Sequence, residues 1–330
     1  TDGPDQTAAF RSQPLQWLFR DLGNQTYNKE TMLEYGWYGE NATDVRTGYV
    51  NGIPTSGNDN SEGGMGKGGS QMMAYPTLFF DYDKDDQRRD VSVCNYGIVL
   101  SAKGNKYQMN TYNGMGVGKY RINWKKDMGA TNNKRNINFP LLRYADVLLM
   151  YAEALNEVNN GPTQEAINAV KEVRKRAFRG NEAKAAAGIP TNHDDFLTFI
   201  QKERKLELSN EGLRRTDLTR WGKQYEMLMA EKQRLVNLAQ RDGEFANVPV
   251  YRAYYLSTTP KFEDPTIALS YIDLSQADVE ALGLSADQIK TLKILNSSSK
   301  GSLKDVKLYE KDGKLYSAVN NPEGAVENSY

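Results

Sequence analysis

Aromatic and hydrogen-bonding side chains alternate in a Gly- and Asn-rich stretch between residues 37 and 75. A pyranose ring presents C–H faces that flat aromatic rings can cover, and hydroxyl groups that Asn, Asp and Arg can bind. Such groups concentrate on loops carried by a rigid scaffold. The candidate residues for sugar binding are Trp37, Tyr38, Asn41, Asp44, Arg46, Tyr49 and Tyr75. The simpler alternative is that Tyr35 and Trp37 are ordinary core aromatics.

A second group of residues combines carboxylates with arginines on two predicted helices. Its members are Arg143, Tyr144, Asp146 and Glu153 at the first helix, and Glu211, Arg214, Arg215, Asp217, Arg220 and Trp221 at the second. A glycoside hydrolase needs two carboxyl groups across a cleft, one of which donates a proton. A carboxylate beside an arginine keeps a low pKa and stays ionised. We therefore interpret this group as structural, with charge-assisted hydrogen bonds that hold adjacent helices together.

Three aspartates, Asp81, Asp83 and Asp85, alternate as they do at the start of an EF-hand calcium loop. That loop needs Gly at its sixth position and a carboxylate, usually Glu, at its twelfth. Asp86 and Ser92 occupy these positions instead, so the pattern does not predict a calcium loop.

The chain has one cysteine, Cys94, and one histidine, His193. Together they cannot supply the three or four ligands that zinc takes. A reactive thiol needs a nearby base, so we expect Cys94 to be a buried or inert thiol. His193 is expected in the first turn of a helix. Because no phosphate-binding loop is present either, the sequence predicts no metal and no cofactor.

The overall charge balance argues against a nucleic-acid partner. The 330 residues include 42 Lys and Arg and 42 Asp and Glu, so the formal net charge is zero. Nucleic-acid binding normally needs a basic excess. No segment approaches the about 18 consecutive apolar residues of a membrane span, and the chain opens without a charged and apolar leader. We expect a soluble chain whose membrane anchor lies in a segment outside it.

Helical periodicity dominates the middle of the chain. Apolar residues follow i, i+3 and i+4 spacing over 141–158, and an Asn-Asn-Gly-Pro link at 159–162 predicts the end of that helix. Thr163 is the expected N-cap of a second helix, a third follows 191–194, and a fourth starts near 216 and runs past 225. A tight link between two helices predicts an antiparallel pair, as in tetratricopeptide arrays. Since such arrays need about three repeats, further pairs are expected upstream of residue 1.

The flanking regions are punctuated by turn residues. The stretch 57–69 predicts an exposed loop, and 91–93 and 98–100 predict short strands. Beyond residue 243, a short helix is expected from about 275 to 289, and Asp312–Gly313 predicts a hairpin between strands 306–310 and 314–318.

Two long segments resemble the signatures of the SusD/RagB family. They are FPLLRYADVLLMYAEALNEV at 139–158 and ERKLELSNEGLRRTDLTRWG at 203–222. Weaker matches are NKETMLE at 28–34, YDKDDQRRD at 82–90 and GKYRINW at 118–124. The resemblance covers roughly residues 25–225, in the order and at a spacing that fit the family.

This resemblance implies a mainly α fold, with tetratricopeptide-like helical pairs, loop-rich insertions and a few short strands. It also implies an outer-membrane lipoprotein of Bacteroidota-type bacteria that captures glycans at the cell surface. Such proteins form a lid over a SusC-like TonB-dependent transporter and are not enzymes. The family's leader and lipidated cysteine are not matched here, so the chain is expected to be a C-terminal portion.

The predicted organisation is one domain in three parts: a loop-rich ligand-binding part at 1–138, a helical scaffold at 139–240 and an irregular segment at 241–330. Three rival functions stay open. A peptide-binding member of the same family would offer backbone hydrogen-bond partners rather than stacked aromatics. A helical-repeat adaptor would present an extended concave surface. A glycoside hydrolase would need paired carboxyl groups in a cleft.

Overall fold

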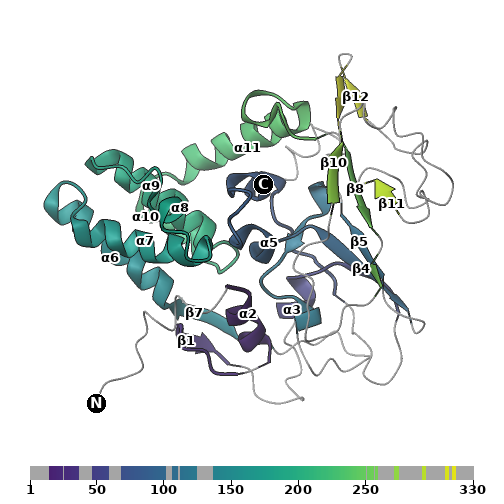
Figure 1. The fold of residues 1–330 in the computed structure, drawn as a ribbon, viewed down its shortest axis with the longest axis horizontal. Coiled ribbons are helices and arrows are strands. Elements are labelled where there is room, and N and C mark those ends of the chain that lie inside the picture. The colour runs from purple at the N-terminus through teal and green to yellow at the C-terminus, as the bar shows by residue number, and fades with distance from the viewer. Residues whose placement is uncertain are drawn as a thin grey trace.

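The computed structural model describes residues 15–24, 26–36, 47–58, 68–101, 106–110, 112–124 and 137–249, and the backbone of short strands beyond residue 250. Figure 1 shows the helices of the middle of the chain gathered on one side and most of the strands on the other. The helical side is built from α6 (Tyr144–Asn159), α7 (Gln164–Ala177), α8 (Glu182–Ala186), α9 (His193–Glu207), α10 (Arg214–Arg220) and α11 (Gln224–Gln240).

An antiparallel helical pair forms the centre of this side, as the sequence predicts. Asn160 ends α6 in the left-handed conformation, at φ 51°, and Thr163 caps α7 by accepting a hydrogen bond from the Ala166 amide at 3.2 Å. Helix α9 begins at His193, as expected, and its cap is Asn192. The apolar faces of α6, α7 and α9 meet in one core, formed by Ala145, Leu149, Ala152, Ala166, Ala169, Val170, Val173, Phe196 and Ile200. The mainly α, tetratricopeptide-like fold is confirmed.

Two boundaries of the predicted helices are wrong. Residues 141–143 are not helical but belong to β7 (Phe139–Arg143), which pairs antiparallel with β1 (Thr31–Tyr35). Pro140 favours an extended residue before it, and β1 supplies a hydrogen-bonding partner that local periodicity cannot reveal. The predicted fourth helix is two helices, because Gly222 has φ 66° and ends α10 before α11 starts.

The other side holds the short helices and strands of the first 124 residues. The helices are α2 (Leu15–Gly23), α3 (Thr47–Val50), α4 (Pro76–Asp81) and α5 (Arg88–Ser92), with 3-10 turns at Tyr112–Gly114, Ile122–Trp124 and, later, Gly243–Phe245. The strands are β2 (Thr55–Asn58), β3 (Val93–Cys94), β4 (Tyr96–Ser101), β5 (Lys106–Met109) and β6 (Gly116–Val117).

These strands form two sheets. Strand β2 runs parallel to β4, and β4 pairs antiparallel with β5, which in turn pairs with β9 (Ser257–Thr258). Strands β3 and β6 form a separate pair. The strand predicted at 98–100 is confirmed in β4. The one predicted at 91–93 is wrong for Val91 and Ser92, which are helical, because Asp86 accepts a hydrogen bond from the Arg88 amide at 2.9 Å and starts the helical turn of α5.

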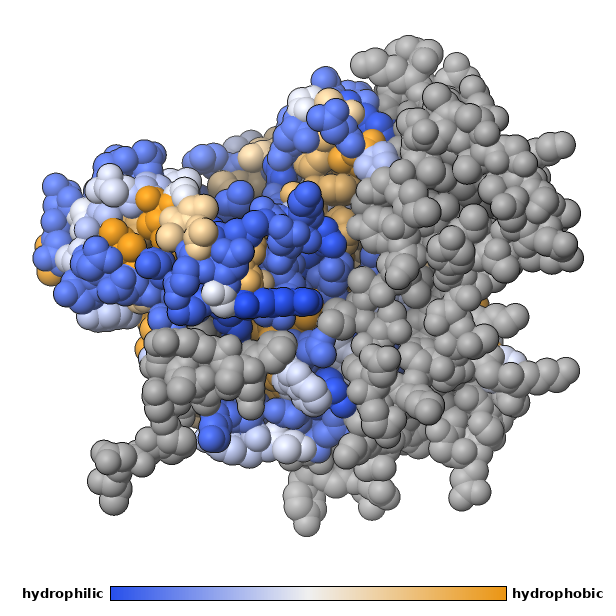
Figure 2. All heavy atoms as spheres, viewed as in Figure 1, coloured by the Kyte–Doolittle hydropathy of each residue, from blue (hydrophilic) through white to orange (hydrophobic). Residues whose placement is uncertain are grey.

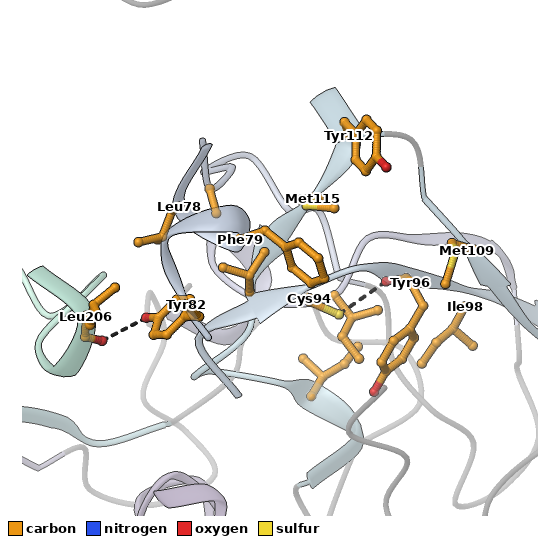
Figure 3. Packing of buried hydrophobic residues seen from close by; sticks show 14 of the residues in the cluster. Leu78, Phe79, Tyr82, Cys94, Tyr96, Ile98, Met109, Tyr112, Met115 and Leu206 are labelled. Atoms are coloured by element: carbon orange, nitrogen blue, oxygen red, sulfur yellow. Dashed lines mark hydrogen bonds between the residues drawn. The ribbon is translucent and has the colours of Figure 1, made fainter. Parts of the chain in front are cut away.

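An apolar core lies beneath this side. It includes Leu78 and Phe79 of α4, Cys94, Tyr96 and Ile98 of the sheets, and Met115 (Figure 3). The Tyr82 hydroxyl crosses to the helical side and donates to the Leu206 carbonyl at 2.7 Å, and the Cys94 thiol donates to the Tyr96 carbonyl at 3.2 Å. The prediction that Cys94 is buried is confirmed, and burial raises the pKa of its thiol.

Beyond residue 250, the backbone shows a three-stranded sheet of β8 (Tyr251–Tyr255), β10 (Tyr271–Leu274) and β11 (Leu292–Ile294). The predicted hairpin is confirmed, since β12 (Tyr309–Lys311) pairs antiparallel with β13 (Lys314–Tyr316). The helix predicted at 275–289 lies outside the described residues.

Candidate functional site

The structure describes two of the seven residues predicted to bind sugar. Trp37, Tyr38, Asn41, Asp44 and Arg46 lie outside the described residues and stay predictions. The backbone of Tyr49 belongs to α3 (Thr47–Val50). Tyr75 immediately precedes α4, and 42% of its surface is exposed.

The fold brings the segments that carry these two tyrosines together. The Met72 amide donates to the Val50 carbonyl at 3.0 Å, which joins the segment before Tyr75 to α3. On its other side, the same segment is joined to β6, because the Ala74 amide donates to the Met115 carbonyl at 3.0 Å and Met73 forms an antiparallel bridge with Gly116. Tyr49 and Tyr75 therefore lie on neighbouring backbone segments, as a shared ligand face requires.

The two ends of the predicted 57–69 loop are also held together. The Thr55 hydroxyl accepts from the Gly68 amide at 2.8 Å, and the Thr55 amide donates to the Gly68 carbonyl at 3.0 Å. Gly68 is required here because an added Cβ would collide with the Ile53 carbonyl oxygen. The residues between, 59–67, lie outside the described part of the chain.

Tyr75 faces a polar group on the helical side. Burial raises the pKa of its hydroxyl, and the Glu231 carboxylate of α11 raises it further. Glu231 is held in turn by Lys205 at 3.2 Å and Arg234 at 3.1 Å. The Tyr75 hydroxyl is therefore neutral at physiological pH and suited to hydrogen bonding.

The residues predicted to be structural fall mainly into two buried clusters. In the first, Arg143 donates to Glu30 at 2.6 Å, to Glu207 at 2.7 Å and to Glu211 at 2.6 and 2.8 Å. We name this cluster the buried charge network. It consists of the carboxylates Glu30, Asp86, Glu203, Glu207 and Glu211 and the cations Arg88, Lys119, Arg143, Arg174 and Arg176. Equal numbers of opposite charges make such deep burial tolerable.

Ionisation in the buried charge network is set by its cations. Burial alone would raise the pKa of Glu207, but Arg176, Arg143, Arg88 and Lys119 together lower it well below the usual range. Arg143 and Lys119 likewise lower the pKa of Glu211 against the effect of burial. Neither carboxyl group can therefore act as a general acid near neutral pH.

Whereas the shifts of Glu207 and Glu211 favour the charged form, the shift of Lys119 favours its neutral form. Burial lowers the pKa of Lys119 to about 8, although Glu211 lies 2.5 Å away. Its ammonium group also donates to the Glu207 carbonyl at 2.7 Å. Lys119 is enclosed completely, which makes it a link between two parts of the chain and not a nucleophile open to substrate.

The second cluster joins three helices of the scaffold. Arg204 of α9 donates to Asp146 of α6 at 2.7 Å and to Asp217 of α10 at 2.8 Å. Arg220 adds a hydrogen bond to Asp217 at 3.0 Å and one to Glu153 of α6 at 2.7 Å. The Trp221 indole donates to Glu153 at 2.8 Å. These contacts are those of helix-to-helix links, and the structural role stays a prediction until the residues are replaced.

Three predicted members have other surroundings. Tyr144 is half-buried against the core of α6, α7 and α9, and its amide donates to the Glu30 carbonyl at 3.0 Å. Arg215 is exposed, and within the described part of the chain its guanidinium makes no ion pair. Arg214 donates to the Gln201 carbonyl at 2.9 Å.

Sequence reasoning named only Arg143 and Glu211 among the ten residues of the buried charge network. Glu30, Arg88 and Lys119 each lie in one of the three weaker family-like segments, 28–34, 82–90 and 118–124. Each contributes one or more charges to the same buried cluster. The presence of a charged residue in each segment was the available indication.

The three aspartates that resemble the start of a calcium loop form ion pairs with basic side chains. Lys184 contacts Asp83 at 3.2 Å and also pairs with Asp85, while Asp81 contacts Arg234 at 2.6 Å and Lys205 at 2.7 Å. Across the described residues, no group of three or more possible metal-binding side chains occurs. No described helix has the length and apolar content to cross a membrane.

The comparisons with known proteins agree on one family. A model of the SusD family matches residues 24–281. SusD-like protein P2 of Formosa agariphila is 33% identical over 162 residues, which are 47% of this chain and 32% of that protein. SusD-like protein P38 of the same organism is 38% identical over 93 residues, 28% of this chain and 18% of that protein.

A solved structure gives the same result at the level of the fold. The SusD homolog from Bacteroides thetaiotaomicron is 30% identical, with a TM-score of 0.60 over 67% of this chain and 47% of that one. The chain thus matches less than half the length of each of these three proteins.

Proposed function

Because the chain belongs to the SusD family, we propose that it is part of a cell-surface protein that captures a glycan and passes it to a SusC-like TonB-dependent transporter. The glycan is bound and not cleaved. The protein is a lipoprotein of the outer membrane, held on the extracellular face through a segment outside this chain. Residues 1–138 supply the ligand face, 139–240 the scaffold, and 241–330 complete the same domain.

One observation carries the binding proposal: the joining of α3 to the segment before Tyr75. The Met72–Val50 hydrogen bond, at 3.0 Å, places Tyr49 and Tyr75 on adjacent segments. In the sequence, α3 directly follows the stretch that contains Trp37, Tyr38, Asn41, Asp44 and Arg46. Aromatic rings and polar groups gathered on a fixed backbone suit the faces and hydroxyls of a sugar.

The state of the charged residues supports a binder over a hydrolase. The carboxyl groups of the two family-like segments 139–158 and 203–222 that lie buried, such as Glu207 and Asp217, contact arginines at hydrogen-bonding distance. A retaining or inverting hydrolase needs one carboxyl group that holds its proton near neutral pH. Strongly paired carboxylates do not meet that need.

The experiment is a calorimetric screen of this protein against starch, laminarin, xylan, pectin and carrageenan, with chromatography of each mixture after prolonged incubation. We expect at least one polysaccharide to bind while its chain length stays unchanged. Release of shorter sugars would overturn the non-catalytic proposal. Binding of extended peptides in place of every polysaccharide would replace glycan capture with the peptide-binding alternative.

The transporter step needs its own test. The full-length protein, co-expressed with a SusC-like transporter of its own organism, should purify with that transporter from detergent-solubilised outer membranes. A full-length protein that is lipidated and at the surface, yet separates from that transporter, would overturn the delivery step while leaving glycan capture in place.

A further inference from the structure

Three large side chains project from the short segment that precedes α4. Met72 is 56% exposed, Met73 53% and Tyr75 42%. Apolar side chains scattered singly on a surface need no explanation, but here three of four consecutive residues expose large side chains. We name residues 72–75 the methionine strip. Ala74, the fourth residue, is buried and packs in the core with Leu78 and Phe79.

The backbone beneath the methionine strip is held on both sides. The Met72 amide binds the Val50 carbonyl, Met73 bridges to Gly116, and the Ala74 amide binds the Met115 carbonyl. Met115 itself lies in the apolar core of Figure 3. The backbone that carries the exposed side chains is therefore fixed in the free protein, so binding a ligand costs little further backbone entropy at these residues.

Ser70, two residues before the strip, shows that this backbone is constrained. Its φ is 42°, a left-handed value that residues other than Gly seldom adopt. Its side chain is buried, and its hydroxyl has no hydrogen-bond partner within the described part of the chain. Gly116 packs directly against it, since an added Cβ would lie 2.9 Å from the Ser70 hydroxyl and 2.5 Å from the Gly52 carbonyl oxygen. Strain of this kind persists where the surroundings fix the chain, and it gathers at ligand-binding sites.

On these observations, and resting on the proposed function, we propose that Met72 and Met73 contact the bound glycan together with Tyr75. The strip spans at most about 10 Å, enough to follow more than one sugar ring. Unbranched thioether side chains adapt to irregular apolar surfaces, so Met suits the C–H faces of pyranose rings. Continuity with α3 through the Met72–Val50 hydrogen bond places the strip beside Tyr49.

The first test measures how exposed Met72 and Met73 are in the unmutated protein. Hydrogen peroxide converts exposed thioethers to sulfoxides, and mass spectrometry of peptides measures each methionine separately. Met150 of α6, which is 42% exposed, is the internal control. In a saturating amount of a polysaccharide that binds in the calorimetric screen, oxidation of Met72 and Met73 should slow several-fold while that of Met150 is unchanged.

The second test uses variants. Met72→Ala combined with Met73→Ala should weaken binding of the same polysaccharide about tenfold, because buried apolar contact is removed from the complex. The matched control, Met150→Ala, should bind normally. Both variants should keep the melting temperature of the parent protein, since the side chains removed are exposed.

The outcomes separate the two proposals. If no polysaccharide binds, the proposed function fails and this inference fails with it. If a polysaccharide binds while Met72 and Met73 oxidise at an unchanged rate, or if the double variant binds normally, only this inference is overturned. Slow oxidation of both residues in the free protein would also overturn it, because the strip would then be covered by the protein itself.

Discussion

Arg143 donates two hydrogen bonds to the Glu211 carboxylate, from Nε at 2.6 Å and from Nη2 at 2.8 Å. This two-point contact joins the end of β7 to the segment that follows α9. Both side chains are almost completely buried, at 1% and 2% exposure. Two parallel hydrogen bonds fix the relative orientation of the groups as well as their distance.

Replacing Arg143 should therefore destabilise the fold strongly. Arg143→Met leaves Glu207 and Glu211 short of a cation in a buried site, and breaking such a pair costs about 3–5 kcal/mol. Urea unfolding should show the loss as a lower midpoint. Arg143→Lys keeps the charge but not the forked geometry, and it should recover part of the stability. An unchanged midpoint for Arg143→Met would contradict the structural role.

Asp217 and Arg215 both lie on α10, but replacing them should have different effects on the free energy of unfolding. Asp217→Asn weakens the contacts to Arg204 and Arg220, and it should lower the free energy of unfolding by about 1–3 kcal/mol. Arg215→Ala removes an exposed side chain and should change it by no more than about 0.5 kcal/mol. Thermal unfolding of both variants makes the comparison. If Asp217→Asn abolished glycan binding at full stability, a role in the ligand site would replace the structural one.

The free energy of unfolding should decrease as the pH falls, because folding lowers the pKa of Glu207 and Glu211. Both have a lower pKa in the folded protein than their ordinary value of 4.5, so the unfolded chain binds more protons as the pH drops. The stability they provide is complete above pH 4.5 and is lost as the pH falls below it. Asp86 opposes this trend, because burial outweighs the attraction of Arg88 and raises its pKa.

The check is urea unfolding from pH 7 down to about 3, with Glu207→Gln for comparison. The variant should be less stable at neutral pH and should lose less stability on acidification. A parent protein whose stability rose on acidification below pH 4.5 would show that Asp86 dominates instead.

The aromatic residues of the ligand face should affect binding without affecting the fold. Trp37→Ala or Tyr49→Ala should weaken the affinity for a polysaccharide, because each removes a stacking surface. Calorimetry measures the affinity, and the melting temperature should stay close to that of the parent. Tyr225→Ala is the control, since Tyr225 is 79% exposed on α11. Normal affinity in both Trp37→Ala and Tyr49→Ala would remove these residues from the site.

The helical pair was predictable because its determinants are local. The caps of α6 and α7, at Asn160 and Thr163, lie within a few residues of the helices that they end or begin. Strand β7 was not predictable in the same way, because its partner β1 lies more than 100 residues earlier. Figure 2 shows a mostly hydrophilic surface with apolar patches over the helical side, which fits the amphipathic patterns read from the sequence.

The candidate site shows the same difference between local features, which the sequence reveals, and long-range contacts, which it does not. Residue types alone could nominate Tyr49 and Tyr75, but the hydrogen bond that brings their segments together joins Val50 to Met72 across the predicted loop. The buried charge network is less local still, since Arg143 and Glu30 are separated by 113 positions. Only the folded chain reveals which charges meet, whereas the sequence reveals only that charges are present.

The buried charge network also bears on how the protein could be divided. Glu30, Arg88 and Lys119 come from one side of residue 138, and Arg143, Glu207 and Glu211 from the other. A fragment beginning at residue 139 would leave Glu207 without Arg88 and Glu211 without Lys119, and the remaining fragment would leave Glu30 without Arg143 and Arg176. Neither fragment should unfold cooperatively on its own, which circular dichroism of each would test, because the residues on the two sides of position 138 neutralise each other's buried charges.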